Sequence, residues 1–276
     1  MIKKNFPKNS SKLPQVMGIL NVTPDSFSDG GHFLAPDIAL KYAFQMAEQG
    51  ARIIDIGGES TRPGAPQVSV QEELDRVIPI LEKVRAELPL KISVDTSKAQ
   101  VMREAIAAGA NMINDIMALR GKDSLATIKS AENVRVCLMH IQGEPRTMQQ
   151  NPHYEDVVSE VKMFLLERVQ TCLDAGIVSS RILIDPGFGF GKTVRHNLLL
   201  MKHLSELTEL DYPVLVGVSR KSMIGKILNK PTSERLYGGL ALAVLAISKG
   251  ARVIRTHDVA ATVDALKMAH AVFSEE

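Results

Sequence analysis

The sequence contains no tryptophan, only two cysteines, and few aromatic residues (4%). Cys137 lies in an apolar run and Cys172 in a helical pattern, so they do not form the closely spaced pairs of disulfide frameworks and zinc sites. No His-x-x-x-His pair occurs either, which argues against a zinc site built by the protein. We therefore expect both cysteines to be inert packing residues in a reducing compartment, and the protein to be cytoplasmic.

The sequence also lacks an excess of charge of one sign and a long hydrophobic run. Lys and Arg number 33 and Asp and Glu 31, which leaves a formal net charge of +2. This balance predicts neither a nucleic-acid surface nor a membrane surface, and no run of about 18 apolar residues could span a bilayer. Residues 1–13 carry four lysines but no apolar stretch typical of a signal peptide, so they are interpreted as a disordered leader.

A combination of helical pattern, glycine and apolar strand recurs along the chain. It is found at Gly50, Gly109 and Gly250, and more loosely at Gly176. Glycine suits the position after a helix because it adopts the left-handed conformation without steric cost. Eight short apolar segments are predicted to be strands: Gln15–Leu20, Arg52–Ile56, Lys91–Val94, Met112–Ile113, Arg135–Met139, Arg181–Ile184, Val214–Val218 and Arg252–Ile254.

Alternation of strands and helices predicts a parallel sheet with helical crossovers. Eight such units without a Pro/Gly/Ser-rich linker favour an α/β fold with one domain, a closed (β/α)8 TIM barrel over residues 14–276, rather than an open doubly wound sheet. Two connections are long, from Asn21 to about Pro36 and from Gly57 to about Ser69. Long connections in a compact domain are commonly lids or binding loops.

Polar or charged residues end every predicted strand: Asn21, Asp55, Asp95, Asn114, His140, Asp185, Ser219-Arg220-Lys221 and Arg255-Thr256-His257-Asp258. Parallel barrel strands point the same way, so these groups converge on the C-terminal mouth, where TIM barrels hold their active sites. A single Asp after a strand is commonly a helix N-cap, and we assign that role to Asp258. Capping does not explain eight polar strand ends in succession.

The polar strand ends divide into two chemical sets. Carboxylate and amide groups suit the N–H edge of a flat heterocycle, and this set comprises Asp95, Asn114 and Asp185, with Lys221 available to a ring carbonyl or nitrogen. The other set is cationic and suits phosphate or carboxylate: Arg62, Arg220, Arg255 and His257. A magnesium ion held mainly by substrate phosphates is compatible with this pattern, because magnesium often takes only one or two protein ligands.

At these strand ends, longer motifs resemble those of one family, the dihydropteroate synthases. The most specific matches are the two long loops, Asn21–Gly31 and Asp55–Gly64. Shorter matches follow in order: Ser93–Ser97, Asn114–Ile116, Met139-His140 with Gly143, Asp185–Lys192, Ser219–Ser222 and Arg255–Asp258. The resemblance extends from Gln15 to Phe273, which is nearly the whole chain.

The resemblance implies a reaction in folate biosynthesis. It would condense (7,8-dihydropterin-6-yl)methyl diphosphate with 4-aminobenzoate, giving 7,8-dihydropteroate and pyrophosphate. In the family the C–O bond is thought to break first, in an SN1-like step, and sulfonamides are inhibitors. The resemblance further implies Mg2+ as a cofactor and a homodimer as the assembly.

Residue roles are also implied at the matching positions. The pterin site would comprise Asp95, Asn114, Ile116, Met139, Asp185 and Lys221. Pyrophosphate would contact Thr61, Arg62, Arg255 and His257. The 4-aminobenzoate site would comprise Phe27, Thr61, Pro63, Phe190, Arg220 and Ser222. Asn21 would ligate Mg2+, and Asp29 would lie near the developing cation. The catalytic set would comprise Asp55, Asp95, Asp185, Lys221, Arg255 and His257.

Three other functions are compatible with part of this pattern. Pterin-binding methyltransferases share the barrel and similar acidic residues but pass a methyl group to a corrinoid cofactor. A catalytically silent pterin binder would show an incomplete cationic set. A phosphate-binding aldolase would need a Schiff-base lysine within a strand, whereas Lys221 lies just beyond one. The cationic motifs and the two long loops favour a pyrophosphate leaving group.

Overall fold

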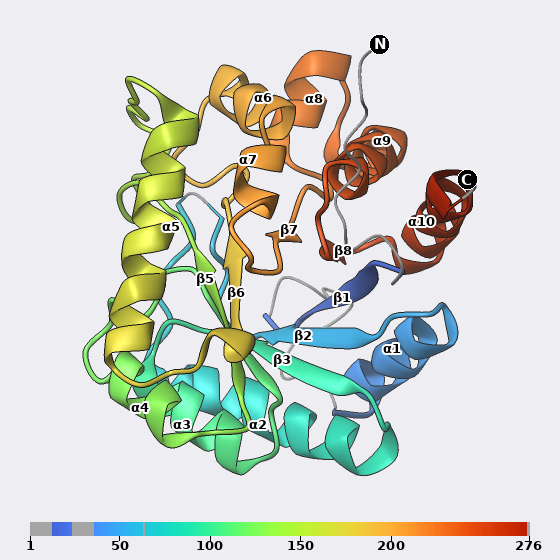
Figure 1. The fold of residues 1–276 in the computed structure, drawn as a ribbon. Coiled ribbons are helices and arrows are strands. Elements are labelled where there is room, and N and C mark those ends of the chain that lie inside the picture. The colour runs from blue at the N-terminus through green and yellow to red at the C-terminus, as the bar shows by residue number, and fades with distance from the viewer. Residues whose placement is uncertain (1–12, 24–35, 63, 275–276) are drawn as a thin grey trace.

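The computed structural model describes residues 13–23, 36–62 and 64–274, so the predicted leader lies almost wholly outside the described residues. Strands lie around a common centre with the helices outside them (Figure 1). The strands are β1 Gln15–Asn21, β2 Ile53–Gly57, β3 Lys91–Asp95, β4 Met112–Asp115, β5 Arg135–Met139, β6 Ile182–Asp185, β7 Leu215–Val216 and β8 Val253–Thr256.

The helices form the outer layer of the molecule (Figure 1). They are α1 Pro36–Glu48, α2 Val70–Glu87, α3 Ala99–Ala107, α4 Ser124–Ser130, α5 Val157–Asp174, α6 Val194–Lys202, α7 Ser205–Thr208, α8 Ser222–Leu228, α9 Leu236–Ser248 and α10 Val259–Ser274, with 3-10 turns at Ser179–Arg181 and Thr232–Glu234. Within the described part of the chain, no helix is long and apolar enough to cross a membrane.

The strands form one parallel ring. Their order is β6-β5-β4-β3-β2-β1-β8-β7, and every neighbouring pair is parallel. A parallel bridge between Ile184 and Val214 joins the two ends of this order, and Ile184 N donates to Pro213 O at 3.1 Å. The predicted (β/α)8 barrel is therefore confirmed.

The glycines predicted to end helices have the expected conformation. Gly50, Gly109, Gly176 and Gly250 have φ angles of 99°, 98°, 92° and 98°. Each follows a helix by one or two residues and precedes a strand or a turn into one. Any other residue would be strained there, so this repeated glycine sets the chain direction between the outer and inner layers.

Several strands extend further than predicted, into the polar residues that were expected to follow them. Asn21, Asp95, Asn114 and Asp185 lie within β1, β3, β4 and β6, so sheet hydrogen bonds fix their backbones. Strand β7 is shorter than the predicted Val214–Val218 and contains only two residues. The chain turns soon after β7, where Arg220 has a left-handed φ of 57°.

The barrel interior contains an apolar layer separate from the core between strands and helices: Met17, Ile53, Met112, Cys137, Leu183, Leu215 and Val253. Side chains alternate along a strand, so the next inward side chain lies two positions later. From Ile53, Met112, Leu183 and Val253, those positions are Asp55, Asn114, Asp185 and Arg255. The polar site therefore lies on an apolar floor, one layer nearer the C-terminal ends of the strands.

Both cysteines are free and fully buried. Burial raises the pKa of the Cys137 thiol well above its ordinary value and raises the pKa of Cys172 to about 11. Their burial confirms the prediction that both cysteines are packing residues, and a raised pKa is typical of an unreactive thiol.

Candidate active site

The centre of the barrel mouth is an ion cluster from β2, β3 and β8. Arg255 donates from Nε to Asp55 Oδ2 at 2.6 Å and from Nη2 to Asp95 Oδ2 at 2.8 Å. Asn114 Nδ2 donates to the same Asp55 oxygen at 3.2 Å. One guanidinium therefore holds together two carboxylates from neighbouring strands.

Two buried oxygen atoms of this cluster, Asp55 Oδ1 and Asn114 Oδ1, have no hydrogen-bond partner among the described residues. Buried polar atoms are nearly always paired, because an unpaired one costs about 1–3 kcal/mol. Both atoms are acceptors, and both belong to side chains one layer above the apolar floor of the barrel. They point to a ligand that brings N–H or O–H donors.

Burial changes the ionisation of the site carboxylates. It raises the pKa of Asp95 to about 7, although the positive charge of Arg255 opposes the rise. It also raises the pKa of Asp185 to about 6, against a hydrogen bond of 2.7 Å donated by Gly187 N to Asp185 Oδ1. Carboxyl groups that titrate near neutral pH in a cleft are typical of functional sites.

An apolar wall lies beside these acids. Ile116 and Met139 cluster with Ile141 and Met148, and the half-buried Phe190 packs against this cluster. Lys221 Nζ lies 4.2 Å from the centroid of the Phe190 ring, within the range of a cation–π contact. Burial lowers the pKa of Lys221 to about 8, with the charge of Arg255 adding to the effect.

His257 is held by a neighbouring strand end. Its Nδ1 lies 3.1 Å from Ser219 Oγ, and its backbone N donates to the same oxygen at 3.2 Å. Burial lowers the pKa of His257 to about 4, and the charges of Arg220 and Arg255 lower it further. The imidazole is therefore neutral near pH 7, in contrast to the cationic role expected from the sequence.

Arg220 differs from expectation as well. It donates to the two carboxylate oxygens of Asp258 at 3.2 and 2.5 Å, so this cation carries its own counter-ion. Asp258 precedes α10 and its backbone carbonyl accepts the N–H of Thr262. It therefore has the backbone position expected of a cap, while its side chain pairs with Arg220.

Comparison with known proteins agrees with this geometry. The family model described as pterin binding enzyme matches residues 17–257. Dihydropteroate synthase of Haemophilus influenzae is 55% identical over 93% of this chain and 93% of its own length. The chain belongs to the dihydropteroate synthase family.

Solved structures of dihydropteroate synthases have the same fold. That of Yersinia pestis, in a complex with a sulfonamide drug, is 50% identical over 95% of both chains, with a TM-score of 0.91. That of Xanthomonas albilineans, in complex with 7,8-dihydropteroate, is 47% identical over 96% of this chain and 95% of that chain, with a TM-score of 0.88.

The structure brings together most of the residues that the dihydropteroate synthase motifs indicated. Asp55, Asp95, Asn114 and Arg255 share hydrogen bonds. Thr61 and Arg62 lie in the β2–α2 loop, and the side chain of Arg62 is exposed. Three predicted site residues lie outside the described residues: Phe27 and Pro63 of the 4-aminobenzoate site, and Asp29.

The sequence does not predict the buried contact between Lys192 and His140. Lys192, only 3% exposed, has its ammonium 2.8 Å from His140 Nδ1 and donates to Gly187 O and Phe190 O at 3.0 Å each. Lys192 therefore fixes the turn between Asp185 and Phe190. A lysine at the end of a glycine-rich segment was visible, but its partner His140 lies 52 residues away.

Proposed function

We propose that this chain condenses (7,8-dihydropterin-6-yl)methyl diphosphate with 4-aminobenzoate to give 7,8-dihydropteroate and pyrophosphate. The observation that carries the proposal is the polar layer above the apolar floor of the barrel, with its unpaired buried acceptor on Asn114. A pterin has a flat ring with N–H donors on one edge, which matches such an acceptor. Membership of the dihydropteroate synthase family supports the same substrates.

The pterin ring is assigned to the deep end of the site. Asp95, Asn114 and Asp185 supply acceptors, Lys221 supplies a donor for the ring carbonyl or nitrogen, and the apolar wall with Ile116 and Met139 covers a ring face. Ionised Asp95 and Asp185 accept N–H donors most strongly. Pterin binding is therefore expected to lower the pKa of both carboxyl groups.

The diphosphate is assigned to Arg255 and His257, with Thr61 and Arg62 contributing from the β2–α2 loop. Burial opposes the charge on Arg255, but Asp55 and Asp95 hold the pKa of its guanidinium above the ordinary value. Arg255 therefore stays cationic and cannot act as an acid. His257 is assigned as a neutral donor: in the tautomer whose Nδ1 accepts the Ser219 hydroxyl proton, Nε2–H is free to meet the diphosphate.

These roles suit a reaction in which the leaving group departs early. The C–O bond breaks with its electron pair on the diphosphate oxygen, leaving a cation on the carbon attached to the pterin. The amine nitrogen of 4-aminobenzoate then forms the C–N bond and loses a proton to water. Fixed charges such as Arg255 stabilise the departing anion without reorganisation, and the buried Asp55 carboxylate is assigned to the pocket near the reacting carbon.

Mg2+ is included in this proposal as a partner of the diphosphate. Among the described residues no group of three or more His, Cys, Asp or Glu could hold a metal ion, which is consistent with an ion held mainly by substrate oxygens. A Cβ atom placed on Gly57 would lie 3.6 Å from Asn21 Oδ1 and 4.0 Å from Asp95 Oδ2, so both oxygens lie next to Gly57. Bound there, Mg2+ would neutralise charge on the leaving group.

The 4-aminobenzoate site is assigned to the outer part of the mouth. Phe190 supplies an aromatic wall, and Ser222 is the first residue of α8. Phe27, Thr61, Pro63 and Arg220 complete the assignment from the family motifs. The sulfonamide complex of the Yersinia pestis relative supports the prediction that sulfonamides compete here. We place the reaction in the reducing cytoplasm, which suits the free Cys137 and Cys172.

The test is pyrophosphate release by the purified protein with Mg2+ and the pterin diphosphate, with and without 4-aminobenzoate. Release that depends on 4-aminobenzoate, gives 7,8-dihydropteroate and is inhibited by a sulfonamide is the expected result. Tight pterin binding without such release would instead support the methyltransferase-like or silent-binder alternatives.

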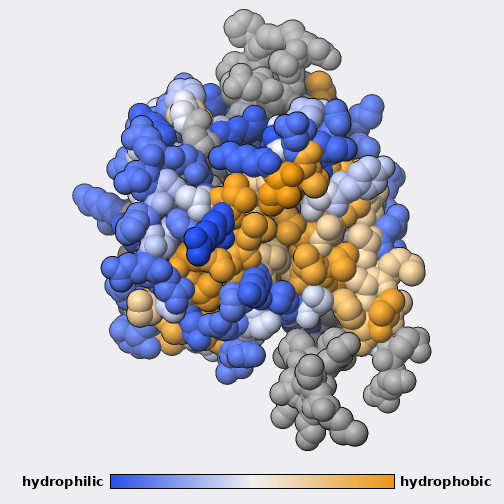
Figure 2. Space-filling model, turned by 90° about the horizontal axis from the view of Figure 1, so that it is seen from above, coloured by the Kyte–Doolittle hydropathy of each residue, from blue (hydrophilic) through white to orange (hydrophobic). Residues whose placement is uncertain are grey.

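A homodimer through the late helices also belongs to the proposal. Hydrophobic residues gather across the face of the molecule shown in Figure 2. Large hydrophobic side chains exposed on α8, α9 and α10 are Ile227, Leu228, Tyr237, Leu245, Met268 and Val272. Exposed apolar patches of this kind mark interaction sites. Sedimentation equilibrium should give twice the mass of one chain, and Tyr237→Glu should give the mass of one.

A further inference from the structure

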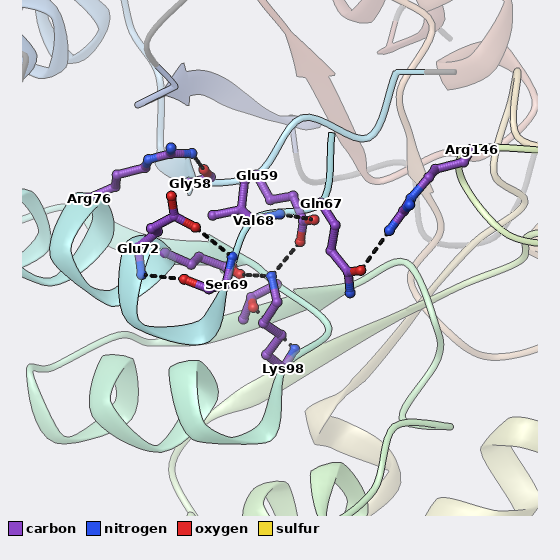
Figure 3. Close-up of polar contacts among 11 residues, drawn as sticks. Gly58, Glu59, Gln67, Val68, Ser69, Glu72, Arg76, Lys98 and Arg146 are labelled. Carbon is purple, nitrogen blue, oxygen red and sulfur yellow. Dashed lines mark hydrogen bonds and ion pairs between the residues drawn. The ribbon is translucent and has the colours of Figure 1, made fainter. Parts of the chain in front are cut away.

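The β2–α2 loop is fastened at its base by one carboxylate. Glu59 Oε1 accepts the backbone N–H of Val68 at 3.1 Å, and Glu59 Oε2 accepts from Lys98 Nζ at 2.5 Å (Figure 3). Residues 59 and 68, which lie near the two ends of the loop, are thereby held side by side. Thr61 and Arg62 lie in the segment between them.

Lys98 connects this loop to two other elements. It lies at the N-cap position of α3, three residues after Asp95. Its ammonium also forms an ion pair with Glu73, in the first turn of α2. The Glu73 side chain is only 1% exposed, and Lys98 and Glu59 are 17% and 26% exposed. Burial opposes the charge on Lys98, but hydrogen bonds to Glu59 and Glu73 raise its pKa above the ordinary value.

Further contacts hold the surroundings of this base. Arg76 Nη1 donates to Gly58 O at 2.9 Å, and Ser69 and Glu72 form a capping box at the start of α2. Figure 3 shows Arg146 approaching the loop from a different direction than Lys98, and it donates to Gln67 at 2.6 Å. The packing of α2 therefore does not depend on Glu59, which makes the carboxylate a suitable place for substitution.

We propose that Glu59 and Lys98 are positioning residues for the outer half of the site: by joining the two ends of the β2–α2 loop to the segment after Asp95, they set where Thr61 and Arg62 meet the diphosphate and 4-aminobenzoate. This inference rests on the proposed function. A loop whose ends are already joined loses less conformational entropy when it orders around a ligand. In this proposal neither residue contacts substrate, and each acts through the position of the loop.

The consequence is confined to the outer half of the site and spares the pterin ring. The pterin residues Asn114 and Asp185 lie on β4 and β6, which the Glu59–Lys98 contact does not reach. Loss of the contact should therefore leave the binding of a pterin without a diphosphate unchanged, whereas 4-aminobenzoate, which the proposed function places against Thr61, should lose affinity. Correct positioning of reacting groups increases the reaction rate by large factors. Displacement of the loop at its base should therefore change the rate measurably.

The decisive variant is Glu59→Ala, which removes the acceptor for Val68 and one partner of Lys98 but leaves Lys98 paired with Glu73. Glu59→Gln, which keeps a carbonyl oxygen for Val68, is the conservative variant. Glu72→Ala is the matched control, because it weakens the start of α2 without touching Glu59 or Lys98. Lys98→Met is less suitable, since it leaves the buried Glu73 without a counter-ion.

Pyrophosphate release and pterin affinity are measured for all variants with the full chain. We expect Glu59→Ala to raise the KM for 4-aminobenzoate about tenfold and Glu59→Gln to show a smaller rise. Both variants and the control should bind a pterin without a diphosphate like wild type. Wild-type KM in Glu59→Ala, or an equal rise in the Glu72→Ala control, would overturn the inference. Absence of 4-aminobenzoate-dependent release by the wild type would instead overturn the proposed function itself.

Discussion

Arg255 Nε lies 2.6 Å from Asp55 Oδ2 at the centre of the barrel mouth, and the Asp55 side chain is fully buried. Removing one partner of a buried ion pair leaves an uncompensated charge and costs about 3–5 kcal/mol. We expect Arg255→Met to lower the free energy of unfolding by an amount in that range and to abolish turnover. Urea denaturation measures the first effect and pyrophosphate release the second.

A double-mutant cycle distinguishes the loss of the Arg255–Asp55 interaction from a general loss of stability. Asp55→Asn makes the buried group neutral, so it no longer needs the guanidinium. The double variant should regain part of the stability that Arg255→Met loses, with a coupling energy of about 1–3 kcal/mol. Strictly additive losses would contradict the assigned interaction between Arg255 and Asp55.

Pterin binding should release protons near pH 6. Burial raises the pKa of Asp95 to about 7 and that of Asp185 to about 6, and N–H donors from a bound pterin favour the ionised carboxylates. Titration calorimetry in buffers of different ionisation enthalpy measures the released protons. We expect release at pH 6, little at pH 8.5, and a smaller value in Asp185→Asn. Equal release at both pH values would exclude these two carboxyl groups as its source.

The same groups predict how the stability of the ligand-free protein depends on pH. Their pKa values are raised above the unfolded values of about 4, so between about pH 4 and 7 the native state binds more protons than the unfolded chain. Their contribution to stability is therefore complete below pH 4 and is lost as the pH rises through 6 and 7. Asp185→Asn should show a flatter decline over this range in urea titrations, and an unchanged slope would refute the raised pKa of Asp185.

The sequence allowed the fold to be predicted because each unit repeats the same local signals. Gly50, Gly109 and Gly250 mark helix ends, and their left-handed conformations follow from the residue type alone. The convergence of Asp55, Asp95 and Arg255 also followed, because parallel barrel strands end at one mouth. Side-chain position at the site is thus largely a consequence of period-two alternation.

Pairing between those side chains could not be predicted. Arg255 contacts Asp55 and Asp95 across 200 and 160 residues, and only closure of the ring brings them together. The charges of the site residues could not be predicted from the sequence either. Burial makes His257 neutral, and Asp258 neutralises the charge of Arg220. Local sequence carries no information about burial by distant elements, so the cationic set expected from residue types differs from the observed one.

Magnesium dependence tests the assignment of Asn21, the last residue of β1. We expect a chelator to abolish pyrophosphate release and added Mg2+ to restore it. Asn21→Ala should raise the Mg2+ concentration needed for half-maximal rate about tenfold, since loss of one oxygen ligand weakens a site with few protein ligands. Affinity for a pterin without a diphosphate should not change. A variant with wild-type Mg2+ dependence would remove Asn21 from the metal assignment.

The ammonium of Lys192 is buried against Gly187 O, Phe190 O and His140. Lys192→Met leaves these acceptors unpaired, at about 1–3 kcal/mol each, so it should destabilise the protein and weaken pterin binding through the Gly187–Asp185 hydrogen bond. The variant Lys202→Leu, at an exposed position, is the control for the loss of a lysine. Urea denaturation and pterin titration measure the two effects.

The pH dependence of that loss has a definite sign. Burial lowers the pKa of Lys192 to about 7, whereas the unfolded value is about 10.4. Between these values the unfolded chain binds more protons than the native state, so the contribution of Lys192 to stability increases as the pH rises from 7 to 10. The stability difference between wild type and Lys192→Met should therefore widen over this range. A difference that stays constant or narrows would show that Lys192 remains fully charged in its buried site.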